Sequence, residues 1–177
     1  ILLDIKYGAG AFMKTFAEAK ELARVMVEIG ISRGKEIAGI LSAMEEPLGY
    51  AVGNALEVAH ACEFLLGRRN DPRVMDITLA LGAELLVSAG IDATPQTAGE
   101  RLARMLSSGK AAEHFDRMVH ALGGPKDFLA HHERHLAAAP IIRPVHAAGE
   151  GLVQAIRTRE LGLAVIELGG GRRVASD

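Results

Sequence analysis

The sequence predicts an α/β protein: part of a mixed or parallel sheet flanked by helices, followed by the start of a smaller α+β domain. Three observations support this class. A strand, a helix and a second strand follow one another within the first 41 residues, four further helical patterns come next, and two apolar extended stretches follow Pro140. The order strand, helix, strand implies a parallel pair with a right-handed crossover. We therefore place a domain boundary near Pro140, between residues 1–139 and 140–177.

Local sequence signals mark the ends of the first strand and of the helix that follows it. A short apolar run is closed by the glycine-rich turn Gly8–Ala11, which is typical of a buried strand. Thr15 and Glu18 form a capping box, which predicts that a helix begins directly after Thr15. The expected elements are a strand over 1–6, a helix from about 16 to Gly30 or Gly34, and a strand over 37–41.

Helical periodicity dominates the middle of the chain. Asn54, Asp71 and Thr94 are candidate N-caps, and a proline follows two of them at the first helical position. After Pro140 the pattern changes to apolar runs typical of strands. The expected helices cover 54–66, 72–90, 95–108, 111–122, a weaker 126–138 and a short 161–168, and the expected strands cover 141–145 and 152–156.

Composition excludes several classes of protein. The chain has 177 residues, long enough to bury a real core, and a formal net charge of −2, whereas a nucleic-acid-binding protein normally shows a basic excess. No apolar run approaches the ~20 residues that span a bilayer, and nothing at the start resembles a signal peptide. We expect a cytoplasmic protein with no nucleic-acid or membrane partner. The single cysteine, Cys62, lies on an apolar helix face and is expected in the core.

Several polar and glycine-rich motifs allow two interpretations. His131 and His135 share a helix face and could bind a metal, but the zincin pattern fails by one position, and a solvated face explains them equally. Adjacent carboxylates at Glu45 and Glu46 could serve acid–base chemistry, although neighbouring side chains usually diverge. The basic turn 169–173 could bind an anion or be a simple glycine turn.

The loop after the first strand is the best-placed candidate site. Gly8 and Gly10 could let backbone amides approach a phosphate, or could simply serve the turn. Loops at the carboxyl ends of parallel strands are where open α/β sheets bind ligands. Phe12, just beyond the glycines, could stack beside a planar ligand or pack in the core.

Four ordered blocks of the sequence carry a further signal: residues 4–13 (DIKYGAGAFM), 43–58 (AMEEPLGYAVGNALEV), 109–115 (GKAAEHF) and 161–173 (LGLAVIELGGGRR). Together they resemble the thymidine phosphorylase and pyrimidine-nucleoside phosphorylase family. The resemblance covers essentially the whole chain. The segment 47–50 (PLGY) resembles the type that accepts uridine as well as thymidine.

The resemblance implies a pentosyltransferase that catalyses reversible phosphorolysis. Phosphate attacks C1′ of a pyrimidine nucleoside, giving the free base and (deoxy)ribose 1-phosphate, in a homodimer that requires no cofactor. The family's phosphate loop and base-anchoring residues precede the region that aligns with Ile1, and its members continue beyond Asp177. We therefore expect a fragment that holds no catalytic residue and is inactive alone. The alternatives are a non-catalytic binding or assembly module and a related phosphoribosyltransferase.

Few site residues carry over from the resemblance. Phe12 matches the position that lines the base pocket, and Gly8 and Gly10 form the adjoining loop. Some members bind a structural monovalent cation through backbone carbonyls at positions that match Leu48 and Ala51. The glutamate that completes that site is replaced here by His60, while Glu57 lies one helical turn away.

Overall fold

The structure is a computed structural model that describes residues 1–175. Its first part is built around a parallel pair of strands. Strands β1 (Leu2–Tyr7) and β2 (Ala38–Ala43) are joined by helix α1 (Phe16–Ser32). Tyr7 pairs with Ala43, so both strands end at the same edge of the sheet. The α/β class and the parallel crossover are therefore confirmed.

Six further helices follow in the described residues. Four agree with the sequence pattern to within two residues, and α7 confirms the short helix expected near residue 161. Asn54 is the first residue of its helix, however, and Gly53 occupies the N-cap without a side-chain bond, so that predicted cap is wrong. The helix expected over 126–138 is reduced to a single turn. The helices are α2 (Asn54–Leu65), α3 (Pro72–Ser88), α4 (Pro95–Ser107), α5 (Lys110–Ala121), α6 (His132–His135) and α7 (Thr158–Glu167).

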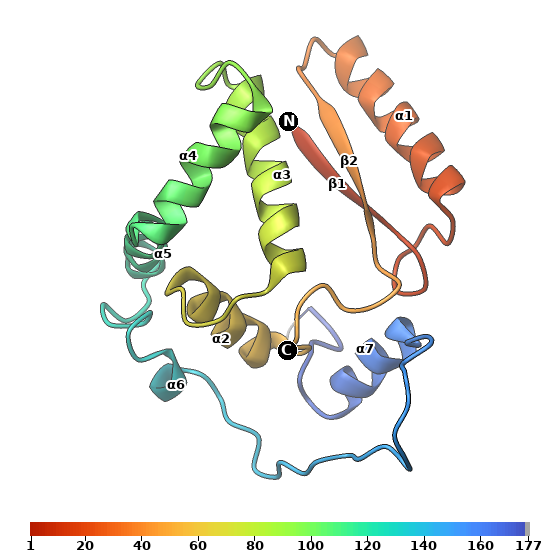
Figure 1. The fold of residues 1–177 in the computed structure, drawn as a ribbon, viewed down its shortest axis with the longest axis vertical. Coiled ribbons are helices and arrows are strands. Elements are labelled where there is room, and N and C mark those ends of the chain that lie inside the picture. The colour runs from red at the N-terminus through yellow and green to blue at the C-terminus, as the bar shows by residue number, and fades with distance from the viewer. Residues whose placement is uncertain (176–177) are drawn as a thin grey trace.

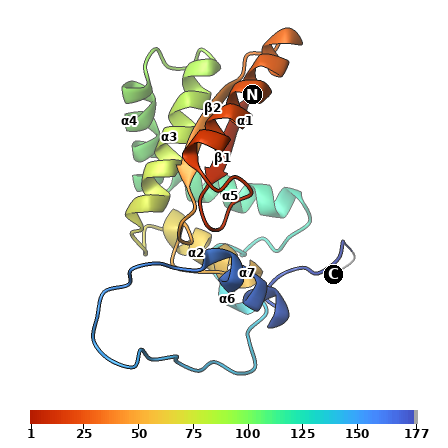
Figure 2. The same ribbon diagram turned by 90° about the vertical axis from the view of Figure 1, so that its right-hand side faces the viewer.

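The sheet lies between α1 and α3, and α4 packs against α3 on the far side (Figure 1). After the long segment that follows α6, helix α7 lies near the edge of the sheet where both strands end (Figures 1 and 2). Residues far apart in sequence therefore meet at that edge.

Two small clusters hold the interior, rather than the single large core that the length allows. Ile5 packs against Ala19 and Ala23 of α1, and Cys62 packs against Ala112 and Leu129. Many larger apolar side chains remain exposed, because the helices spread around the sheet and leave one face of each uncovered. Examples are Phe16 at 54%, Ile29 at 57% and Leu122 at 81% exposure.

The two strands predicted after residue 140 do not form. Neither helix nor strand is assigned over 137–157, and Val145 and Leu152 are 98% and 87% exposed. Figure 2 shows this segment as a wide arc that leaves the rest of the fold. A strand needs a neighbour to complete its hydrogen-bond ladder, and no described strand lies beside the arc. The domain division at residue 140 stays a prediction.

The predicted capping box begins α1. The Thr15 hydroxyl accepts a bond from the backbone amide of Glu18, and the Glu18 carboxylate accepts from the backbone amides of Lys14 and Thr15. These backbone bonds, Thr15 first, lower the pKa of Glu18. Gly34, at φ +67°, lies just beyond the C-cap Arg33 and is the helix stop.

The small side chain of Ala19 sets the distance between α1 and the sheet. Ala19 is fully buried against Ile5, whereas Ala17 on the same helix is exposed. We expect Ala19→Leu to lower the free energy of unfolding by about 1–3 kcal/mol, because the added volume must separate helix and sheet. Ala17→Leu is the matched control and should leave denaturant unfolding almost unchanged. Equal effects of the two variants would contradict this packing.

Candidate functional site

The loop after β1 is held by bonds within the protein. Gly8 has φ +115°, and a Cβ there would lie 2.7 Å from Oε1 of Glu45. A Cβ on Gly10 would lie 2.7 Å from Cγ2 of Thr158. Both glycines are thus required for backbone conformation or close approach. Their contact with a substrate stays a prediction.

The loop amides already have acceptors. The amide of Gly8 donates to the carbonyl of Met13, that of Gly10 to Met44, and that of Ala11 to Gly8. The amide of Ala9 donates to Oε2 of Glu45 at 3.1 Å. An anion would have to displace these bonds, so the observed bonding favours the turn over a phosphate cradle.

Glu45 and Glu46 point to different partners. Glu45 holds the loop through Ala9, while Glu46 lies 2.6 Å from Nη1 of Arg73, at the start of α3. The same guanidinium nitrogen donates to the carbonyl of Pro47 at 3.1 Å. The two carboxylates therefore do not form an acid–base pair, which agrees with the divergence expected of neighbours.

Thr158 ties the end of the chain to this edge. Its hydroxyl donates to the backbone carbonyl of Glu45 at 2.7 Å, across 113 residues of sequence, and its side chain is buried. Sequence reasoning missed this contact, since nothing near a lone threonine signals so distant an acceptor. Glu45 and Thr158 together fix the position of the glycine loop.

Phe12 lies beside a groove along β1. Its side chain is 94% exposed, so the alternative of core packing is wrong. The groove, of about 480 Å³, is lined mainly by apolar side chains, among them Met13, Leu22, Met26 and Met44, and also by Gly10 and Lys6. A flat apolar ligand could lie against the Phe12 ring here. The assignment of Phe12 to a base pocket stays a prediction.

A network of three polar side chains links β1 and β2 beside this groove. Nζ of Lys6 lies 2.5 Å from Oδ2 of Asp4 and donates to the Ser42 hydroxyl at 2.8 Å, and that hydroxyl donates to Oδ1 of Asp4 at 2.6 Å. Because Lys6 and Ser42 are register partners, the contact crosses between the strands. The period-two spacing of Asp4 and Lys6 was the signal that could have placed them on one face.

The three positions predicted to hold a cation lie around one cavity, and the cation itself stays a prediction. Leu48, Ala51 and His60 line one cavity of about 590 Å³, beside Glu57. Oε1 of Glu57 accepts a bond from the backbone amide of Gly53 at 2.9 Å. No cluster of three or more potential side-chain metal ligands occurs within residues 1–175.

The other motifs serve the structure. His131 is the N-cap of α6 and His135 lies 3.2 Å from Oδ1 of Asp127, which favours a polar surface over a joint metal site. The amide of Asn54 donates to the carbonyl of Gly170 at 2.7 Å, and Nη2 of Arg173 donates to the carbonyl of Glu167. The turn 169–173 thus packs against the start of α2.

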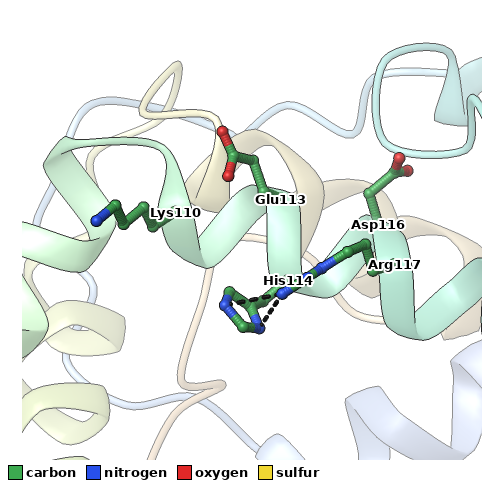
Figure 3. Close-up of a pocket in the computed structure, with 5 residues that line it drawn as sticks. All are labelled: Lys110, Glu113, His114, Asp116 and Arg117. Carbon is green, nitrogen blue, oxygen red and sulfur yellow. Dashed lines mark hydrogen bonds between the residues drawn. The ribbon is translucent and has the colours of Figure 1, made fainter.

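A shallow charged pocket lies away from this edge, on α5 (Figure 3). Nη2 of Arg117 lies 2.8 and 2.9 Å from the two ring nitrogens of His114, and Lys110, Glu113 and Asp116 complete the pocket. Oδ1 of Asp116 accepts the amide of Leu129. None of the sequence-predicted site residues contributes to this pocket.

Fold and site together define an α/β protein with its candidate ligand edge at the carboxyl ends of two parallel strands. No described helix combines the length and apolar character needed to cross a membrane.

No protein-family model matches the chain, but curated proteins match it from end to end. The thymidine phosphorylases of Burkholderia orbicola (strain MC0-3) and Burkholderia cenocepacia (strain HI2424) are each 48% identical over 177 residues. The thymidine phosphorylase of Burkholderia lata is 47% identical over the same length. In each case the match covers 100% of this chain and 40% of the relative. By sequence, the chain is similar to thymidine phosphorylases along its whole length, and it spans about two fifths of the length of those relatives.

We expect Glu45→Ala to loosen the glycine loop. The variant removes the acceptor of the Ala9 amide, a bond worth about 1 kcal/mol, which corresponds to roughly fivefold faster amide hydrogen exchange at Ala9. Glu46→Ala is the matched control, because its partner Arg73 lies outside the loop. Equal exchange rates at Ala9 in both variants would show that Glu45 does not hold the loop.

Cys62 should be unreactive while the protein is folded. The side chain is fully buried, and burial, followed by the charges of Glu63 and Asp116, raises the pKa of its thiol. Since the thiolate is the reactive form, iodoacetamide should label Cys62 only in denaturant, as measured by mass spectrometry. Rapid labelling of the native protein would contradict the burial of this residue.

Proposed function

We propose that the protein carrying this chain catalyses the reversible phosphorolysis of pyrimidine nucleosides. A phosphate oxygen bonds to C1′ of the sugar as the bond from C1′ to the base nitrogen breaks, and the electron pair of that bond leaves with the base. The products are the free base and (deoxy)ribose 1-phosphate. The observation that carries this proposal is the 48% identity to thymidine phosphorylases along all 177 residues.

The chain would contribute one wall of the nucleoside site rather than the groups that bind phosphate. Charge develops on the leaving base and on the sugar, so cationic and hydrogen-bonding groups must meet it. In the family these groups precede the region that aligns with Ile1. Phe12 supplies an exposed ring, and Glu45 with Thr158 supports its loop. We accordingly propose that residues 1–177 alone do not release base.

The family resemblance also supports a homodimer for the whole protein, and the sequence composition favours a cytoplasmic location. The segment 47–50 favours acceptance of uridine besides thymidine. Substrate preference and assembly are both measurable on the protein that carries this chain.

The direct test supplies that protein with phosphate and either thymidine or uridine and measures release of base by chromatography. We expect release of thymine and uracil that depends on phosphate. Anthranilate with a phosphoribosyl donor is the control for the phosphoribosyltransferase alternative and should not react. Absence of base release from both nucleosides would overturn the proposal and favour the binding or assembly module.

Phe12→Ala tests the place of the base. Loss of the ring should raise KM for the nucleoside about tenfold, equivalent to about 1.4 kcal/mol of binding, and leave KM for phosphate unchanged. Leu122→Ala removes another largely exposed apolar side chain, at the C-cap of α5, and is the control. An unchanged nucleoside KM in Phe12→Ala would remove Phe12 from the base pocket.

A further inference from the structure

A buried histidine faces a buried aspartate beneath the loop that follows β2. Nε2 of His60, on α2, lies 3.4 Å from Oδ2 of Asp71, the N-cap of α3, and their side chains are only 11% and 3% exposed. Neither atom has a hydrogen-bond partner within the described residues, and the 3.4 Å contact between them is the polar contact that they make. A buried polar atom without a partner costs about 1–3 kcal/mol, so separating the two side chains should destabilise the fold.

The surrounding loop is shaped to the imidazole. A Cβ on Gly49 would lie 2.5 Å from Cε1 and 2.8 Å from Nδ1 of His60, so only glycine lets the backbone pass this close. The ring of Tyr50 meets the His60 ring edge-on at 6.4 Å between centroids. The imidazole therefore packs closely against residues 49 and 50.

A hard cation does not fit this donor set. Sodium, potassium and calcium ions take oxygen ligands, whereas the side chain at position 60 offers nitrogen. Nε2 of that ring faces Asp71, and the neighbouring carboxylate of Glu57 already accepts the amide of Gly53. The side chains at positions 57 and 60 are thus already in contact with other groups of the protein.

We propose that the His60–Asp71 pair takes over the structural work of that cation, so that the protein needs no metal at this place. The pair joins α2, the start of α3 and the loop 47–53. Oδ1 of Asp71 meanwhile caps α3 by accepting the amide of Val74 at 3.2 Å. The joined loop continues directly from Glu45, whose carboxylate holds the Gly8–Phe12 loop. The pair stabilises the fold whether or not the protein carries out phosphorolysis.

The test measures thermal unfolding of the protein that carries this chain, in chelator and then with K⁺, Ca²⁺ or Zn²⁺. We expect the midpoint to be the same in all four conditions. A rise with any of these cations, Zn²⁺ included, would overturn the proposal.

The second experiment repeats the thermal unfolding with the variant His60→Glu. It sets a carboxylate against Asp71, and the two like charges should lower the midpoint by several degrees in chelator. Ca²⁺ or K⁺ should then recover part of the loss. A His60→Glu protein whose stability does not respond to either cation would count against the proposal.

Asp71→Asn keeps the test decisive if His60→Glu does not fold. Asparagine is as good an N-cap as aspartate, so this change can keep the bond to Val74 while an uncharged amide group replaces the carboxylate oxygen that faces His60. We expect a lower midpoint and faster hydrogen exchange at Gly49 and Tyr50. His146→Gln, at an exposed histidine in the arc 137–157, is the control and should match the unmodified protein. Wild-type exchange in Asp71→Asn would overturn the proposal.

Discussion

The parallel pairing of β1 with β2 is the constraint on which the candidate site depends. Because Tyr7 and Ala43 are register partners, the segments that follow them leave the same edge of the sheet. Only this pairing brings the Glu45 carboxylate to the amide of Ala9, 36 residues earlier. The glycines of the first loop then have a clear purpose, since a Cβ on Gly8 or Gly10 would collide with Glu45 or Thr158.

Two contacts of different chemistry hold the loop that follows β2 in place. Arg73 binds Glu46 and the carbonyl of Pro47 from the exposed side, and the His60–Asp71 pair lies beneath Gly49. Surface ion pairs contribute little because water screens them, whereas buried polar atoms are costly if separated. The buried pair is therefore the stronger of the two constraints, and any change at this loop should be interpreted through it.

The arc 137–157 and the groove along β1 both leave apolar side chains exposed. Residues 137–157 leave the fold as an extended segment, yet Thr158 brings α7 back to the carbonyl of Glu45. Phe12 and Met26, which flank the groove along β1, keep much of their surface exposed. Apolar surface of this kind is a site for a ligand or for further protein, and a nucleoside base is the ligand proposed here.

Local signals in the sequence were sufficient for most elements. The Thr15–Glu18 capping box and the Asp71 and Thr94 caps act within one helical turn, so the sequence alone determined where α1, α3 and α4 begin. It left the end of α1 open between Gly30 and Gly34, and the structure places it before Gly34. Residues 141–145 and 152–156 have the composition of strands, but a strand depends on a partner, which tertiary structure decides. The Thr158–Glu45 bond and the His60–Asp71 contact also join residues distant in sequence, and no local pattern encodes such a distance.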